Sequence, residues 1–154
     1  WYEWPIILRP VFYYSNSTVE GLVQGISAFG NPLVWWVGIP ASMYMVYRIF
    51  KYKDKLALFL IAAYMVQLGP WMLVTRITFM YHYFPSVPFI VLMIGYCMKC
   101  FAGENKRRIR GAIVYTAASV ALFALFYPVL NGMPVESEFV VNGLKWMKDW
   151  VLTL

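Results

Sequence analysis

Four long runs of apolar residues constrain this chain more than any other feature of its sequence. The runs extend over residues 32–50, 56–74, 86–101 and 109–130. Each approaches the ~20 residues that an α-helix needs to cross a hydrocarbon core of about 30 Å. Only 13% of the 154 residues are charged, about half the share in a typical soluble domain. The sequence therefore predicts an all-α membrane protein with four transmembrane helices, which form the region 32–130.

Local signals mark two of the helix ends. Asn31 precedes Pro32, and this pair suits a helix start because Asn accepts a bond from the first turn and Pro loses no donor there. Pro70 removes a backbone donor near the end of the second run. We therefore expect the second helix to kink or end close to Pro70.

The N-terminal flank, residues 1–31, is not predicted to span the membrane. Pro5 and Pro10 prevent a continuous helix, while residues 12–28 are compatible with a short β-hairpin. The flank is also rich in aromatic side chains of the kind favoured at a bilayer interface. These are Trp1, Tyr2, Trp4, Phe12, Tyr13 and Tyr14.

The C-terminal flank, residues 131–154, is too polar to span. A helix over 138–152 would place four apolar side chains on one face, namely Val140, Leu144, Met147 and Val151. Lys145 and Lys148 would lie away from that face. This pattern predicts an amphipathic helix that lies in the membrane interface.

The distribution of basic residues predicts the orientation. Nine of the thirteen Lys and Arg residues lie in two connections, 48–55 and 99–110. The positive-inside rule places both connections in the cytoplasm. Both termini and the connection at 75–85 then face the extracytoplasmic side. The net charge of +6 is explained by these clusters, so no nucleic-acid partner is expected.

Arg76, His82 and Arg9 are the residues that could carry chemistry on that side. The planar guanidinium of Arg76 would suit a lipid-linked phosphate, or Arg76 simply snorkels to the headgroups. His82 could donate to a phosphate or assist proton transfer, or serve as an interfacial hydrogen-bonding residue. Arg9 is a second candidate anion ligand, with a plain interfacial anchor as the alternative.

Cys97 and Cys100 have a CxxC spacing, but no further Cys and no nearby His completes a zinc site. Two reduced thiols on a helix are expected rather than a redox pair, and no metal site is predicted. A nucleotide-binding glycine loop and a recognisable Ser/His/Asp arrangement are also missing. Taken alone, the residues predict a membrane module that binds an anionic lipid, without the groups of a complete enzyme.

Three segments resemble the C-terminal membrane region of protein O-mannosyltransferases. Residues 1–14 (WYEWPIILRPVFYY) are similar to that family's WPLxLRPVWYY segment. Residues 30–36 (GNPLVWW) are similar to its GNPxxWW helix start, and residues 70–85 (PWMLVTRITFMYHYFP) resemble its PWxxxxRxxFxYHYxP block. The third block is long enough to be specific, and the resemblance covers nearly the whole chain.

The resemblance implies part of a larger GT-C helix bundle that transfers mannose from polyprenyl-phosphate mannose to Ser or Thr hydroxyls of proteins. It implies that the catalytic acidic pair lies in an N-terminal half, so no catalytic residue is expected here and the chain alone should be inactive. The matching residues Arg9, Arg76, His82 and Tyr83 would contact the donor lipid and its phosphate. No cofactor is implied beyond this donor substrate.

The expected partners are thus the lipid bilayer, polyprenyl-phosphate mannose, the Ser or Thr of an acceptor protein, and the N-terminal half of the same enzyme. Because the chain opens on Trp1 rather than Met, it is interpreted as a fragment. A bacterial cell membrane is favoured, with the membrane of the endoplasmic reticulum as the alternative. The competing hypotheses are another lipid-phosphate-sugar transferase of GT-C type and a non-catalytic membrane subunit.

Overall fold

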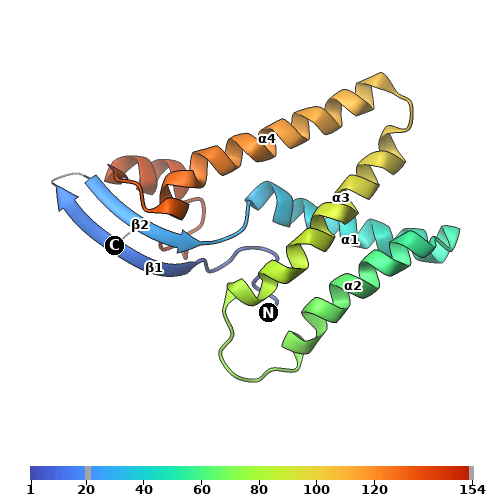
Figure 1. Ribbon diagram of the computed structural model, residues 1–154, viewed down its shortest axis with the longest axis horizontal. Coiled ribbons are helices and arrows are strands. Elements are labelled where there is room, and N and C mark those ends of the chain that lie inside the picture. The colour runs from blue at the N-terminus through green and yellow to red at the C-terminus, as the bar shows by residue number, and fades with distance from the viewer. Residues whose placement is uncertain (20–21, 153–154) are drawn as a thin grey trace.

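Four long helices and a small β-sheet build the protein (Figure 1), a computed structural model that describes residues 1–19 and 22–152. In chain order the elements are β1 (Val11–Val19), β2 (Leu22–Ala28), α1 (Pro32–Tyr52), α2 (Lys55–Met72), the 3₁₀-helix η1 (Met80–Ser86), α3 (Val87–Ala102), α4 (Lys106–Asn131), β3 (Val135–Glu136) and the π-helix η2 (Phe139–Leu144). The sheet lies at one end of the molecule, and the helices extend from it toward the two helix connections at the other end (Figure 1).

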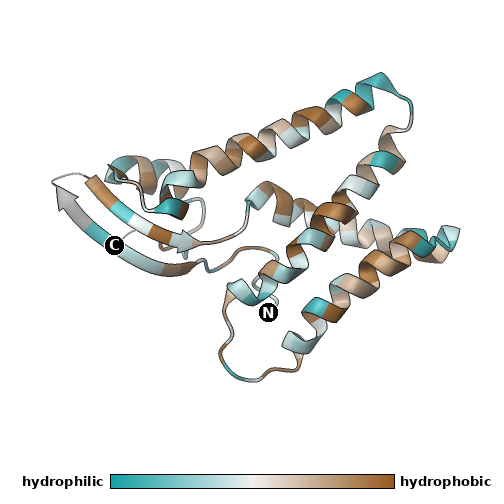
Figure 2. Ribbon diagram, in the orientation of Figure 1, coloured by the Kyte–Doolittle hydropathy of each residue, from teal (hydrophilic) through white to brown (hydrophobic). Residues whose placement is uncertain are grey.

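The four predicted spanning helices are confirmed. Among the described residues, four helical stretches are long and apolar enough to cross a membrane, the third of them including η1. Apolar residues follow all four helices, whereas hydrophilic residues gather at the α1–α2 and α3–α4 connections (Figure 2). The helix α2 ends at Met72, two residues after Pro70, as the sequence predicted.

Side-chain caps fix where three of these helices begin. Asn31 accepts a hydrogen bond from the Leu33 N–H at 3.0 Å, which confirms the predicted start of α1. Asp54 caps α2 and Asn105 caps α4 in the same way. Because Asn105 caps the first turn, α4 can begin among charged residues. It starts at Lys106, three residues before the apolar run at 109.

The helix α1 is the centre of the bundle and packs against both α2 and α3. Gly38 allows the close approach of α3, since a Cβ on this residue would lie 2.3 Å from Cγ2 of Ile90. Gly30 makes room for the buried indole of Trp35 in a similar way, with an added Cβ only 1.8 Å from that ring. The absence of a Cβ at these two positions leaves the space that the Trp35 and Ile90 side chains occupy.

The β-hairpin expected over residues 12–28 is confirmed and extended. The strands β1 and β2 are antiparallel, with Val11 opposite Ala28 and Ser15 opposite Gly25. The short strand β3 then adds to β2, which gives the order β1-β2-β3. The tail after α4 therefore returns to the N-terminal flank and adds the third strand of the sheet.

The amphipathic helix predicted over 138–152 is wrong beyond Leu144, where η2 ends. Val140 and Leu144 are buried inside the protein, but so are Trp150 and Leu152, whereas Val151 is exposed. No single helix face fits that pattern. The Ser27 hydroxyl donates to the Val151 carbonyl at 3.0 Å, and this contact holds the end of the tail against β2.

Candidate functional site

The N-terminal segment that precedes β1 is held in place by two tryptophans from distant parts of the chain. The indole N–H of Trp36, on α1, donates to the Ile6 carbonyl at 3.0 Å. The indole N–H of Trp150, in the tail, donates to the Ile7 carbonyl at 2.7 Å. Ile7 is fully buried and has a positive φ of 55°, a strained conformation for a β-branched residue. These contacts position the adjacent Arg9.

A hollow of about 350 Å³ lies between this N-terminal segment and the connection that follows α2. One wall comes from Glu3, Trp4 and residues 9–12, and the other from residues 77–80. The structure thus brings Arg9 to the same hollow as the residues that directly follow Arg76. Of the four predicted site residues, Arg9 lines this hollow, whereas Arg76, His82 and Tyr83 are not among its lining residues and only flank residues 77–80 in sequence.

Both arginines of the predicted site remain available to an anion. The guanidinium of Arg9 is 3.9 Å from the Glu3 carboxylate, and its side chain is 69% exposed. Such an exposed ion pair contributes little free energy, typically about 0–1 kcal/mol, so it would oppose the binding of another anion to Arg9 only weakly. Arg76 is exposed, and no ion pair joins it to an acid among the described residues.

His82 is held by a hydrogen bond and by three aromatic rings. Its Nδ1 lies 3.0 Å from the Phe79 carbonyl, and because a carbonyl only accepts, Nδ1 must carry a proton. The imidazole stacks on Tyr81 at 4.3 Å and on Trp4 at 6.2 Å, and meets Trp71 edge-on at 4.2 Å. Nε2 is consequently the nitrogen left for a ligand: it accepts in the neutral ring and donates in the imidazolium.

Tyr83 lies in the interior rather than on the surface of the site. Its side chain is 1% exposed, and its hydroxyl is 2.8 Å from the Tyr64 hydroxyl on α2. Its ring packs against Trp35 at 4.9 Å. Tyr83 is therefore buried next to His82 in sequence, and it joins η1 to α1 and α2.

Trp4 and Trp71 are the residues of this region that sequence reasoning missed. Trp4 was expected at the membrane interface, but it is 4% exposed and lies between the hollow and the His82 ring. Both tryptophans are part of the resembling segments, which was the only available signal. Nothing in the sequence indicated Tyr64, whose role depends on a contact with Tyr83 across two elements.

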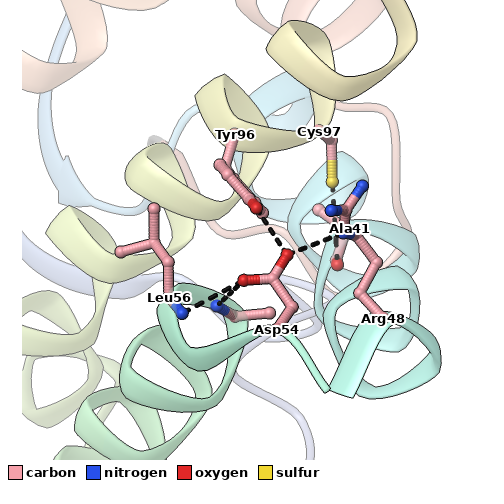
Figure 3. Close-up of polar contacts among 7 residues, drawn as sticks. Ala41, Arg48, Asp54, Leu56, Tyr96 and Cys97 are labelled. Carbon is pink, nitrogen blue, oxygen red and sulfur yellow. Dashed lines mark hydrogen bonds and ion pairs between the residues drawn. The ribbon is translucent and has the colours of Figure 1, made fainter. Parts of the chain in front are cut away.

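A second polar cluster (Figure 3) lies at the α1–α2 connection, at the end of the helices opposite the sheet (Figure 1). Asp54 accepts hydrogen bonds from Tyr96 and from the Arg48 Nε, the latter at 2.8 Å. The Tyr96 hydroxyl is the main cause that lowers the pKa of the Asp54 carboxyl, with the Ala57 N–H and Arg48 adding to it. Both carboxylate oxygens are thus engaged, since Oδ1 also accepts from the Leu56 and Ala57 N–H groups, and we interpret this cluster as structural.

The cysteines and acids of the described residues provide no further site. Cys97 is buried and Cys100 is partly exposed, and both thiols are free. No group of three or more His, Cys, Asp or Glu side chains gathers in the part of the chain that the structure describes.

The fold is that of a multi-pass membrane protein, and the candidate site lies at one end of its helices. Residues 1–150 match the family model of the C-terminal four-transmembrane region of protein O-mannosyltransferase. The chain belongs to this family, as the three sequence segments predicted.

The chain is 28% identical over 163 residues to a polyprenol-phosphate-mannose–protein mannosyltransferase of Mycobacterium tuberculosis, covering 97% of this chain and 31% of that protein. It is 22% identical to the protein of the same name from Corynebacterium glutamicum, with the same coverage. Dolichyl-phosphate-mannose–protein mannosyltransferase 1 of Saccharomyces cerevisiae is 25% identical over 96% of this chain and 20% of its own length. The chain therefore spans less than a third of these relatives. No solved structure matches it.

Proposed function

We propose that this chain is the C-terminal membrane part of an enzyme that transfers mannose from a polyprenyl-phosphate carrier to Ser or Thr hydroxyls of proteins. Within that enzyme, Arg9, Arg76 and His82 bind the donor phosphate, and Tyr83 supports His82 from behind. The observation that carries this assignment is the hollow shared by Arg9 and residues 77–80. The names of the relatives, which act with a phosphate-linked mannose donor, support it.

The chemistry follows from the charges around the hollow. When the bond between mannose and the carrier phosphate breaks, negative charge develops on the departing phosphate. Arg9 and Arg76 stabilise that charge, because preorganised cations cost no reorganisation at the moment of reaction. With Nδ1 bonded to Phe79, His82 contacts the phosphate through Nε2 and needs a second proton to donate. Donor binding is then coupled to proton uptake.

The base that activates the acceptor hydroxyl belongs, in this proposal, to the N-terminal half of the enzyme. We divide the chain into a flank at 1–31, a membrane region at 32–130 and a tail at 131–154. The proposed phosphate site then combines Arg9 of the flank with Arg76 and His82 of the membrane region. The tail contributes by holding that flank through the bond between Trp150 and Ile7.

We further propose that the phosphate site faces the extracytoplasmic side of a bacterial cell membrane. Both basic connections lie at the end of the helices opposite the sheet (Figures 1 and 2), and the positive-inside rule favours the cytoplasm for such residues. Single-cysteine labelling with a membrane-impermeant reagent tests this orientation: a cysteine at Ile77 should react from outside intact cells, and one at Lys53 should not.

Substitution of Arg76 in the full-length protein tests the site. We expect Arg76→Ala to abolish mannose transfer to an acceptor peptide, and Arg76→Lys to restore only part of it, because an ammonium lacks the planar fork that matches a phosphate. Lys148→Ala is the matched control, since it removes an exposed cation at the same end of the molecule. Near-normal transfer by a folded Arg76→Ala protein would show that Arg76 is only an anchor.

A calorimetric titration tests the part assigned to His82. The donor, or its polyprenyl-phosphate product, is added in two buffers that differ in ionisation enthalpy. We expect the apparent binding enthalpy to depend on the buffer for the wild-type protein and not for His82→Gln. Equal buffer dependence of the two proteins would exclude His82 as the group that takes up the proton.

A further inference from the structure

We propose that the α3–α4 connection and the adjacent groove form a binding site for an anionic phospholipid, separate from the donor site. Five cations and a single acid lie in residues 99–110. The residues from Gly103 to Arg110 are all exposed, and no salt bridge joins any of these cations to an acid within the described chain. This unneutralised charge lies at the end of α3 and α4 opposite the sheet (Figure 2).

An apolar groove begins at this cluster. A hollow of about 430 Å³ between α1, α3 and α4 has Arg108 at its rim, and its other lining residues include Tyr44, Phe101 and Ala112. Arg108 is oriented by a hydrogen bond from its Nη1 to the Phe101 carbonyl at 2.8 Å. A cation is thus fixed at the mouth of a groove whose walls are apolar.

The groove continues along the helices. A second hollow, of about 390 Å³, shares Ile94, Met98 and Tyr115 with the first and reaches Phe123 on α4. On α4 the two hollows together are lined by residues from Arg108 to Phe123, a stretch of roughly 24 Å at the usual helical rise. A groove of about 24 Å suits an extended hydrocarbon chain, and the cations at one end suit a phosphate headgroup.

Charge complementarity with an anionic headgroup distinguishes the α3–α4 connection from the α1–α2 connection. At 48–55, Arg48 pairs with Asp54 and Lys51 bonds to the Tyr47 hydroxyl, so half of its four cations have partners within the chain. The membrane orientation alone explains why both connections are basic. It does not explain why the cations at 99–110 have no acidic partner among the described residues and adjoin an apolar groove.

Photo-crosslinking of the full-length protein in nanodiscs of phosphatidylcholine tests the site. The probes are phosphatidylglycerol and phosphatidylcholine, each with a diazirine on an acyl chain, and the labelled residues are identified by mass spectrometry. We expect the phosphatidylglycerol probe to label the groove at Met98 and Tyr115 in preference to the phosphatidylcholine probe. Lys106→Gln with Arg107→Gln should reduce this preference roughly fivefold for each cation removed.

Two further variants separate the site from a general surface effect. Lys53→Gln with Lys55→Gln removes two exposed cations from the other connection and should leave labelling of the groove unchanged. Ala112→Leu should fill the groove and abolish labelling by both probes, while mannose transfer shows that the protein is folded. The proposal is overturned if the two probes label the groove of the wild-type protein equally. It is also overturned if the Lys53 and Lys55 variant loses as much of the preference for phosphatidylglycerol as the Lys106 and Arg107 variant. Finally, it is overturned if neither probe labels the groove because other helices of the full-length protein cover it.

Discussion

The indole N–H of Trp150 donates to the Ile7 carbonyl at 2.7 Å, although 143 positions separate the two residues. Both side chains are fully buried, so neither group has water as an alternative partner. The bond holds Ile7 in its left-handed conformation, two residues before Arg9. The geometry of the candidate phosphate site therefore depends on a residue in the tail.

Trp150→Phe isolates this hydrogen bond. Phenylalanine keeps most of the apolar packing but leaves the Ile7 carbonyl buried without a donor, which costs about 1–3 kcal/mol. We expect a loss of that size in the free energy of unfolding of the full-length protein in mixed micelles. Trp146→Phe is the control, because its indole N–H bonds to the Gly143 carbonyl at an exposed position, and it should change stability by no more than ~0.5 kcal/mol.

Gly38→Ala should disturb the contact between α1 and α3. The added Cβ would lie 2.3 Å from Cγ2 of Ile90, and overpacking of this kind costs about 1–3 kcal/mol. Ile90→Ala alone should also destabilise the protein, by about 2–5 kcal/mol. The double variant should lose less than the sum of the two single losses, because the smaller side chain accommodates the new methyl group. Additive losses, measured by the same unfolding assay, would contradict this packing.

Asp54 should make the stability of the helix connection depend on pH. The pKa of Asp54 is lowered in the folded protein, so its contribution is fully present above the unfolded value of about 3.9 and is lost as the pH falls through the folded pKa. Asp54→Asn removes the charge while an amide oxygen can still cap α2. We expect a lower unfolding midpoint for Asp54→Asn at neutral pH, a larger loss for Asp54→Ala, and convergence of wild type and Asp54→Asn in acid. A constant difference at all pH values would rule out the charge as the cause.

Trp4 should position His82. The ¹⁵N resonances of the His82 ring, assigned by comparison with His82→Gln, should show the Nδ1-protonated neutral tautomer in the wild-type protein, because Nδ1 donates to Phe79. Trp4→Ala removes a stacking face and should give an average of both tautomers with weaker donor binding. Trp4→Phe should restore the wild-type signal. An unchanged tautomer in Trp4→Ala would show that Trp4 contributes packing only.

Most of the membrane region could be predicted from sequence because burial in lipid requires long apolar runs. The helix ends were less predictable, since polar caps such as Asn105 let α4 start among charged residues. The prediction of a helix over the whole tail was wrong for a different reason. Its apolar spacing fits a helix, but the bonds from Ser27 and Trp150 to distant backbone carbonyls stabilise a non-helical path beyond Leu144.

The candidate site was predictable only where it is local in sequence. Arg76 and His82 lie within one short segment, and Arg9 lies within another. That these segments meet at one hollow depends on contacts of Trp4, Trp36 and Trp150, for which the sequence contains no periodic signal. The orientation of the site relative to the membrane and its assignment to phosphate stay predictions.

The bond between Trp150 and Ile7 also sets an order of events during synthesis. Ile7 emerges from the ribosome 143 residues before its partner, a delay of roughly 7–30 s at usual elongation rates of about 5–20 residues per second. During that interval the N-terminal segment lacks the indole N–H of Trp150, the hydrogen-bond donor that fixes Ile7. The N-terminal part of the candidate site can therefore reach its final conformation only after α4 and the tail have been synthesised.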